Sequence, residues 1–124
     1  MTEFTHIKDD KAYMVDVTDK PDVGRVAVAA GKIYLREETV AAIRSGEVVK
    51  GNVLATARVA GIQAVKQTSN LIPMCHPLPV GGVNIDFNDI EGEPCIEAVC
   101  TVRTYGKTGV EMEALTGVSI ALLT

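Results

Sequence analysis

The sequence predicts a mixed fold in which antiparallel strands and helices share one core. Residues 83–88 and 96–102 place apolar side chains at every second position, and the turn-rich stretch 89–94 joins them as an antiparallel hairpin. The apolar residues of 51–68 recur with helical spacing and predict an amphipathic helix. At 124 residues the chain is long enough for one hydrophobic core, so we expect a single domain over residues 1–124.

Two strands and a short helix are predicted in the first 46 residues. Residues 12–18 and 25–36 are rich in Val, Ile and Tyr with partial alternation, and a turn at 20–22 and Gly31 interrupt them. Residues 37–45 open with two acids and are followed by a glycine, an order that the helix dipole and a glycine C-cap favour. This stretch is therefore predicted to be helical.

Two helices are predicted in the remainder of the chain, with a stiff loop between them. The stripe of the helix over 51–68 consists of Val53, Leu54, Ala57, Ala60, Gly61, Ala64 and Val65. Three prolines in 71–80 exclude a helix and a central strand, so an extended loop is expected. Residues 105–109 predict a turn and 110–124 a helix. Its expected apolar stripe is Leu115, Val118 and Leu122.

The composition excludes several classes of protein. A net charge of -4 argues against a nucleic-acid-binding module, and no apolar run approaches the roughly 20 residues of a membrane span. The N-terminus lacks the basic start and apolar stretch of a secretory signal, so we expect a cytoplasmic protein. The odd cysteine count fits neither a disulfide framework nor a metal-binding pair. We expect reduced thiols at Cys75, Cys95 and Cys100.

The middle of this acidic chain is basic. Residues 25–80 hold seven of the 12 Lys and Arg residues, which suits a local site for a small anion near Lys50 and His76. Scattered, solvated charges are the alternative interpretation. Lys50 precedes the long helix and could hold an anion at its N-terminus; the alternative is a solvated surface lysine. Lys107 precedes the last helix and could do the same; the alternative is a plain turn. A nucleotide-binding P-loop is excluded because Thr101 stands where that motif needs glycine.

Three side chains are candidates for chemistry on the residues alone. His76 lies between two prolines, which fix it on a stiff loop, and its pKa range suits proton transfer. Its neighbour Cys75 points the opposite way in extended backbone, which disfavours a Cys-His nucleophile or a hydrolase built on the pair. If the last helix includes Glu111 and Glu113, they point about 200° apart, so only one of them can face a site.

Five segments of the chain carry a resemblance to a known family. They are Met14-Val-Asp-Val17, Lys50-Gly51, Ala55-Thr-Ala-Arg58 followed by Ala60-Gly-Ile-Gln-Ala64, Leu71-Ile-Pro-Met-Cys-His-Pro-Leu78, and Gly106-Lys-Thr-Gly-Val-Glu-Met-Glu-Ala-Leu-Thr116. Together they resemble the molybdenum cofactor biosynthesis protein C family, whose members are cyclic pyranopterin monophosphate synthases. The resemblance runs over almost the whole chain.

The resemblance implies an α+β fold of the ferredoxin-like kind, with an antiparallel sheet packed against helices. It implies a homohexamer built as a trimer of dimers, with active sites at the dimer interface. The implied substrate is anionic, a 3′,8-cyclised dihydro-GTP, and the products are cyclic pyranopterin monophosphate and diphosphate. Proton transfers and phosphate positioning are expected to suffice without a cofactor or a metal.

The resemblance also implies roles for individual residues. Lys50, His76 and Glu113 are implied to be catalytic. The implied substrate-binding residues are Arg25, Met74, Cys75, His76, Lys107, Glu111, Met112 and Glu113.

Family members continue into a stretch with a catalytic aspartate and a second catalytic lysine, which follow the position of Thr124. We therefore expect a further C-terminal segment in the natural protein. The alternative function is a non-catalytic oligomeric binding protein for a phosphorylated purine or pterin.

Overall fold

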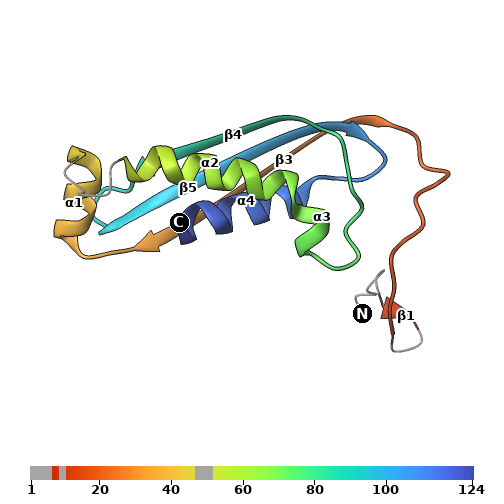
Figure 1. The fold of residues 1–124 in the computed structure, drawn as a ribbon, viewed down its shortest axis with the longest axis horizontal. Helices are drawn as coiled ribbons and strands as arrows, with labels where there is room; N and C mark the ends of the chain where they lie inside the picture. Colours follow the sequence, from red (N-terminus) through yellow and green to blue (C-terminus); the bar gives the residue numbers. More distant parts are fainter. Residues whose placement is uncertain (1–6, 9–10, 47–51) are drawn as a thin grey trace.

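The fold centres on a three-stranded antiparallel sheet (Figure 1). The computed structural model describes residues 7–8, 11–46 and 52–124. Strands β3 (Val23–Tyr34), β5 (Cys95–Gly106) and β4 (Val80–Asp89) lie in that order, so β5 pairs with both others. A separate pair of two-residue strands, β1 (Ile7–Lys8) and β2 (Lys11–Ala12), lies away from this sheet.

Helices cover one face of the sheet. Helices α2 (Val53–Lys66) and α4 (Glu111–Leu123) lie side by side on it, α1 (Glu37–Ser45) lies at one end, and α3 (Thr68–Leu71) continues from α2 (Figure 1). The succession β3, α2, β4, β5, α4 follows the β-α-β-β-α order that begins the ferredoxin-like motif. The predicted α+β fold is confirmed. Among the described residues, no helix is long and apolar enough to cross a bilayer.

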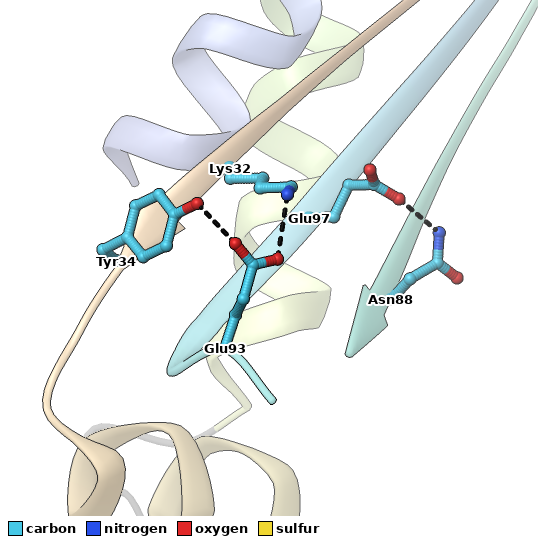
Figure 2. Close-up of polar contacts among 5 residues, drawn as sticks. All are labelled: Lys32, Tyr34, Asn88, Glu93 and Glu97. Carbon is cyan, nitrogen blue, oxygen red and sulfur yellow. Dashed lines mark hydrogen bonds and ion pairs between the residues drawn. The ribbon is translucent and has the colours of Figure 1, made fainter. Parts of the chain in front are cut away.

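The predicted hairpin is present, and a polar cluster ties its loop end to β3. In the loop between β4 and β5, the Glu93 carboxylate accepts hydrogen bonds from Lys32 Nζ and Tyr34 Oη, both at 2.9 Å (Figure 2). The lysine contact, followed by the tyrosine contact, lowers the pKa of Glu93. Asn88 Nδ2 donates to Glu97 Oε1 at 3.2 Å between β4 and β5. These bonds join all three strands at one end of the sheet.

The close approach of α2 and α4 explains the predicted stripe of small residues. Gly61 and Gly117 face each other across the two helices, and a Cβ at position 61 would lie 3.0 Å from the Gly117 carbonyl oxygen. A Cβ at position 117 would lie 2.7 Å from Val65 Cγ2 and 2.8 Å from Cys100 Sγ. Neither position has room for a side chain, so the glycines let the two helices pack closely against each other, with α2 on β4 and α4 on β3 and β5.

The strand predicted over 12–18 is wrong beyond Ala12. Residues 13–17 lie outside helices and strands, and two local hydrogen bonds form there: Lys20 N donates to the Val17 carbonyl oxygen, and Asp16 accepts from Thr18. These two hydrogen bonds on Asp16 lower its pKa. Among the described residues, the pairing of β2 with β1 ends at Ala12, and alternation without a paired neighbour does not make a stable strand.

Two further expectations are corrected by the packing of α4. The strand over 25–36 is not interrupted at Gly31, because the missing Cβ lets Leu122 and Val118 pack directly over β3. Leu115 is 48% exposed and does not belong to the buried stripe. The buried face of α4 is made mainly of small side chains, with Glu113 as the exception. Its buried residues are Glu113, Ala114, Thr116, Gly117, Val118 and Ala121.

Gly117→Ala is expected to lower the free energy of unfolding by about 1–3 kcal/mol, since the new methyl group overpacks the contact with Val65 and Cys100. Urea denaturation measures this loss. Gly24→Ala is the matched control, because nothing lies within 4 Å of a Cβ there, and its change should stay within about 0.5 kcal/mol. Equal effects of the two variants would contradict the close-packing argument.

Candidate functional site

A cavity of about 560 Å³ lies at the end of α4 where the helix begins. This volume falls within the range of small-molecule sites. Three parts of the chain form its walls: the segment before β3, the proline-rich loop, and the start of α4. The lining residues are Ala12, Val15, Val17, Lys20, Ile72, Pro73, Met74, Cys75, His76, Thr108, Gly109, Glu111, Met112 and Glu113.

The proline-rich loop presents Met74, Cys75 and His76 to this cavity. α3 ends at Leu71, and the prolines keep the following residues out of regular structure, as predicted. Met74 adopts a left-handed conformation with φ of 65°, which is uncommon for a non-glycine residue. Such strained backbone conformations often accompany functional sites. The turn at Met74 brings the next two side chains to opposite walls.

His76 is anchored to the segment before β3. Its Nε2 lies 2.6 Å from the carbonyl oxygen of Val15. A carbonyl oxygen only accepts, so Nε2 carries the hydrogen in this contact, and the other ring nitrogen, Nδ1, has the lone pair when the ring is neutral. The contact therefore fixes both the tautomer and the orientation of the ring.

Cys75 contacts α4. Its thiol lies 3.7 Å from Glu113 Oε2 and 3.8 Å from the His76 carbonyl oxygen. Burial, and then the nearby Glu113 charge, raise the pKa of Cys75 to about 11. The thiol is therefore protonated at neutral pH and is a hydrogen-bond donor, not a nucleophile.

Glu113 is the buried carboxyl group of the site. Helix α4 begins at Glu111, so Glu111 and Glu113 point in different directions as expected, with Glu113 only 3% exposed and Glu111 exposed. Burial, with a smaller contribution from the Glu111 charge, raises the pKa of Glu113. Among the described residues, its Oε1 has no hydrogen-bond partner. Both glutamates still line the cavity, together with Met112.

Arg25 and Lys107 contact the main chain instead of lining the cavity. Arg25 Nε donates to the Gly106 carbonyl oxygen at 3.0 Å, and Arg25 Nη2 to that of Lys107 at 3.2 Å. Lys107 Nζ donates to the carbonyl oxygens of Thr18 and Lys20 at 3.2 and 3.1 Å. Arg25 thus holds the loop before α4 against β3, and Lys107 holds it against the segment before β3. Lys50 lies outside the described residues.

The wall formed by the segment before β3 was missed from the sequence. Lys20 lines the cavity, as do Val15 and Val17 from the same segment. The sequence marked this region by a predicted strand, by the turn at 20–22 and by the segment Met14-Val-Asp-Val17, but none of these pointed to a contact with His76, 61 positions later. Within the described ranges, no three His, Cys, Asp or Glu side chains come together as a group that could hold a metal ion.

An α+β domain with a half-enclosed cavity, a fixed histidine and a buried carboxyl has the features of a small-molecule binding or catalytic protein.

Residues 14–124 match the model of the MoaC family. Two relatives, from Methanocorpusculum labreanum and Methanoregula boonei, are 66% and 64% identical over the whole of this chain and 78% and 79% of their own lengths. A third, from Pyrococcus abyssi, is 58% identical over 97% of this chain and 74% of its own length. All three are named probable cyclic pyranopterin monophosphate synthase. The chain belongs to the MoaC family.

Glu113→Gln is expected to stabilise the ligand-free protein at neutral pH by about 1 kcal/mol, since it removes a buried charge. The raised pKa means that ionisation costs more in the folded than in the unfolded chain, so this carboxyl destabilises the fold as pH rises above its ordinary 4.5. Urea denaturation at about pH 4 and about pH 7.5 should show a gain only at the higher pH.

The matched control is Glu111→Gln, in the same helical turn but exposed. It removes a charge that the helix dipole favours and also one that raises the pKa of Glu113, so the two effects oppose each other and stability should change by less than about 0.5 kcal/mol. A loss of stability in Glu113→Gln at neutral pH would contradict the burial argument.

Proposed function

We propose that this protein is a cyclic pyranopterin monophosphate synthase of molybdenum cofactor biosynthesis. It converts (8S)-3′,8-cyclo-7,8-dihydroguanosine 5′-triphosphate to cyclic pyranopterin monophosphate and diphosphate, as a phosphorus-oxygen lyase. The observation that carries the proposal is the cavity, which unites Met74, Cys75 and His76 with Met112 and Glu113. The names of the relatives support the same activity.

The reaction rebuilds a purine as a pterin and closes a cyclic phosphate with loss of diphosphate. The steps need protons moved at defined atoms, and His76 is suited to this because its tautomer is fixed by Val15. Glu113 binds or transfers a proton from the buried side of the cavity, and Met74 and Met112 provide apolar contacts for the rings. Lys50 is the third of the proposed catalytic residues.

The phosphates of the substrate are proposed to lie toward the loop before α4. Arg25 and Lys107 fix that loop through its carbonyl oxygens and through the segment before β3. Lys20 lines the same cavity and supplies positive charge near a triphosphate. Glu111 also lines the cavity, and its charge, after burial, contributes to the raised pKa of Glu113, which favours the protonated carboxyl.

We further propose that the chain is a single domain that assembles as a homohexamer, a trimer of dimers, in the cytoplasm. The three cysteines are free thiols, which suits a reducing compartment. The sheet face opposite α2 and α4 exposes an apolar patch on β3, with Val26 and Val28 at its centre. Charges of both signs border this patch: Lys32 on β3 forms an ion pair with Glu93, and Glu97 is its strand partner on β5.

Turnover of the cyclised dihydro-GTP, followed by mass spectrometry of diphosphate and pterin, tests the activity. His76→Ala should lower kcat by about 10²–10⁴-fold because the ring carries the proton, while the melting temperature changes little. His76→Gln is the control, since its amide can still donate to the Val15 carbonyl oxygen. Full activity of His76→Gln would show that only the anchoring contact matters.

Saturable binding of the substrate without diphosphate release would instead favour the alternative function, a binding protein for a phosphorylated purine or pterin.

Val28→Lys is expected to lower the solution mass measured by light scattering, since it places a charge in the centre of the proposed subunit contact. Val28 is 63% exposed on the open sheet face. Val59→Lys is the control of the same residue type, 67% exposed on α2. Dissociation caused by Val59→Lys but not by Val28→Lys would contradict the proposed contact face.

A further inference from the structure

The Glu113 carboxyl is an unusual group because one of its oxygens is buried and has no hydrogen-bond partner among the described residues. Burying a polar atom without a hydrogen bond costs roughly 1–3 kcal/mol, so such atoms are rare unless a ligand or water completes them. Oε1 of Glu113 is the buried side-chain polar atom without a partner in the part of the chain that the structure describes. It belongs to a residue that lines the cavity. This pattern indicates that a donor on a bound molecule completes it.

The other oxygen, Oε2, is held by a thiol from a different element. The Cys75 Sγ lies 3.7 Å from it, within the range of a hydrogen bond that involves sulfur. The single thiol hydrogen has a second acceptor within reach, the His76 carbonyl oxygen at 3.8 Å. The carboxylate attracts it more strongly because hydrogen bonds to a charged acceptor are the stronger ones.

The backbone is arranged to make this contact. Cys75 follows the left-handed Met74, which turns the loop toward α4, and Glu113 lies in the first helical turn between the buried residues Val110 and Ala114. The two side chains are 38 positions apart in the sequence. A loop held in a strained conformation and a helix fixed by its packing thus meet at one thiol and one carboxyl.

We propose that Cys75 is a positioning residue whose S–H group holds Oε2 of Glu113 and thereby directs Oε1 to accept an N–H group of the substrate's heterocyclic base. The inference rests on the proposed function for the identity of the base. It assigns the thiol neither nucleophilic nor metal-binding chemistry. Purine and pterin rings both carry ring N–H and amino donors that match such an oxygen.

The effect of losing the Cys75 thiol can be detected through the pKa of Glu113. The ionisable groups of the cavity are Lys20, Cys75, His76 and Glu111, besides Glu113 itself. Burial, and to a smaller extent the Glu111 charge, raise the pKa of Glu113, whereas the backbone N–H of Glu113 and the Cys75 thiol lower it. Loss of the thiol should therefore raise the pKa of Glu113 and leave less carboxylate at a given pH.

The kinetic test compares Cys75→Ala with Cys75→Ser across pH. Cys75→Ala should lower kcat/KM roughly tenfold, mainly through KM, because an interaction with the unreacting part of the base is lost. The acidic limb of kcat/KM should also move to higher pH. Cys75→Ser keeps a donor and should restore both. An unmoved acidic limb in Cys75→Ala, or no rescue by serine, would overturn the proposal.

A second measurement needs no activity. The infrared difference spectrum between the unmodified protein and Cys75→Ser isolates the S–H stretching band of Cys75. In Glu113→Gln this band should move to higher frequency, since a neutral amide is a weaker acceptor than a carboxylate. Cys95→Ala, which removes a buried thiol at the far end of β5, should leave the Cys75 band and the acidic limb unchanged.

The two measurements separate the possible failures. An inactive protein whose Cys75 band responds to Glu113→Gln would contradict the proposed activity and support the contact. An active protein whose band does not respond would overturn the positioning role alone.

Discussion

The packing of α4 determines where the chemistry of the cavity lies. Val110, Ala114, Val118 and Ala121 are buried at the spacing of successive helical turns. Glu113 lies one turn before Gly117, the residue at which α4 closely approaches α2. The same rotation of the helix that buries Ala114 and Gly117 therefore also buries the Glu113 carboxyl. A larger residue at Gly117, or at Gly61 opposite it on α2, would displace this turn and, with it, the wall of the cavity.

The periodic spacing of apolar and small residues within single helices and strands made most of the fold predictable. The hairpin, the small-residue stripe of α2 and the helix after Gly109 all follow from spacing that one element carries by itself. The segment before β3 could not be predicted in this way, because its carbonyl oxygens are bonded by His76 and Lys107, which are far away in the sequence. The contact between Cys75 and Glu113 was equally invisible, since it needs the loop and the helix to be placed first.

The electrostatic interpretation of the basic middle segment changes once contacts are known. Lys32 and Arg44 form ion pairs with Glu93 and Asp89, at 2.9 and 2.6 Å. Arg58 donates to the Ile85 carbonyl oxygen at 2.8 Å and lies over the Phe87 ring. These basic residues stabilise the fold instead of forming a free positive surface. Within the described residues, the positive charge that lines the cavity comes from Lys20, which belongs to the acidic N-terminal stretch.

The protonation states of the cavity suggest a division of labour within the proposed reaction. Burial raises the pKa of both Cys75 and Glu113, which suits groups that hold a ligand by hydrogen bonds in a water-poor place. His76 is only partly buried and has one ring nitrogen committed to Val15, which leaves the other to exchange a proton. A reaction with several proton transfers needs both kinds of group, because the ligand must be held in one orientation while protons move. The cavity separates the two kinds of group: Cys75 and Glu113 meet where the proline-rich loop contacts α4, and His76 lies against the segment before β3.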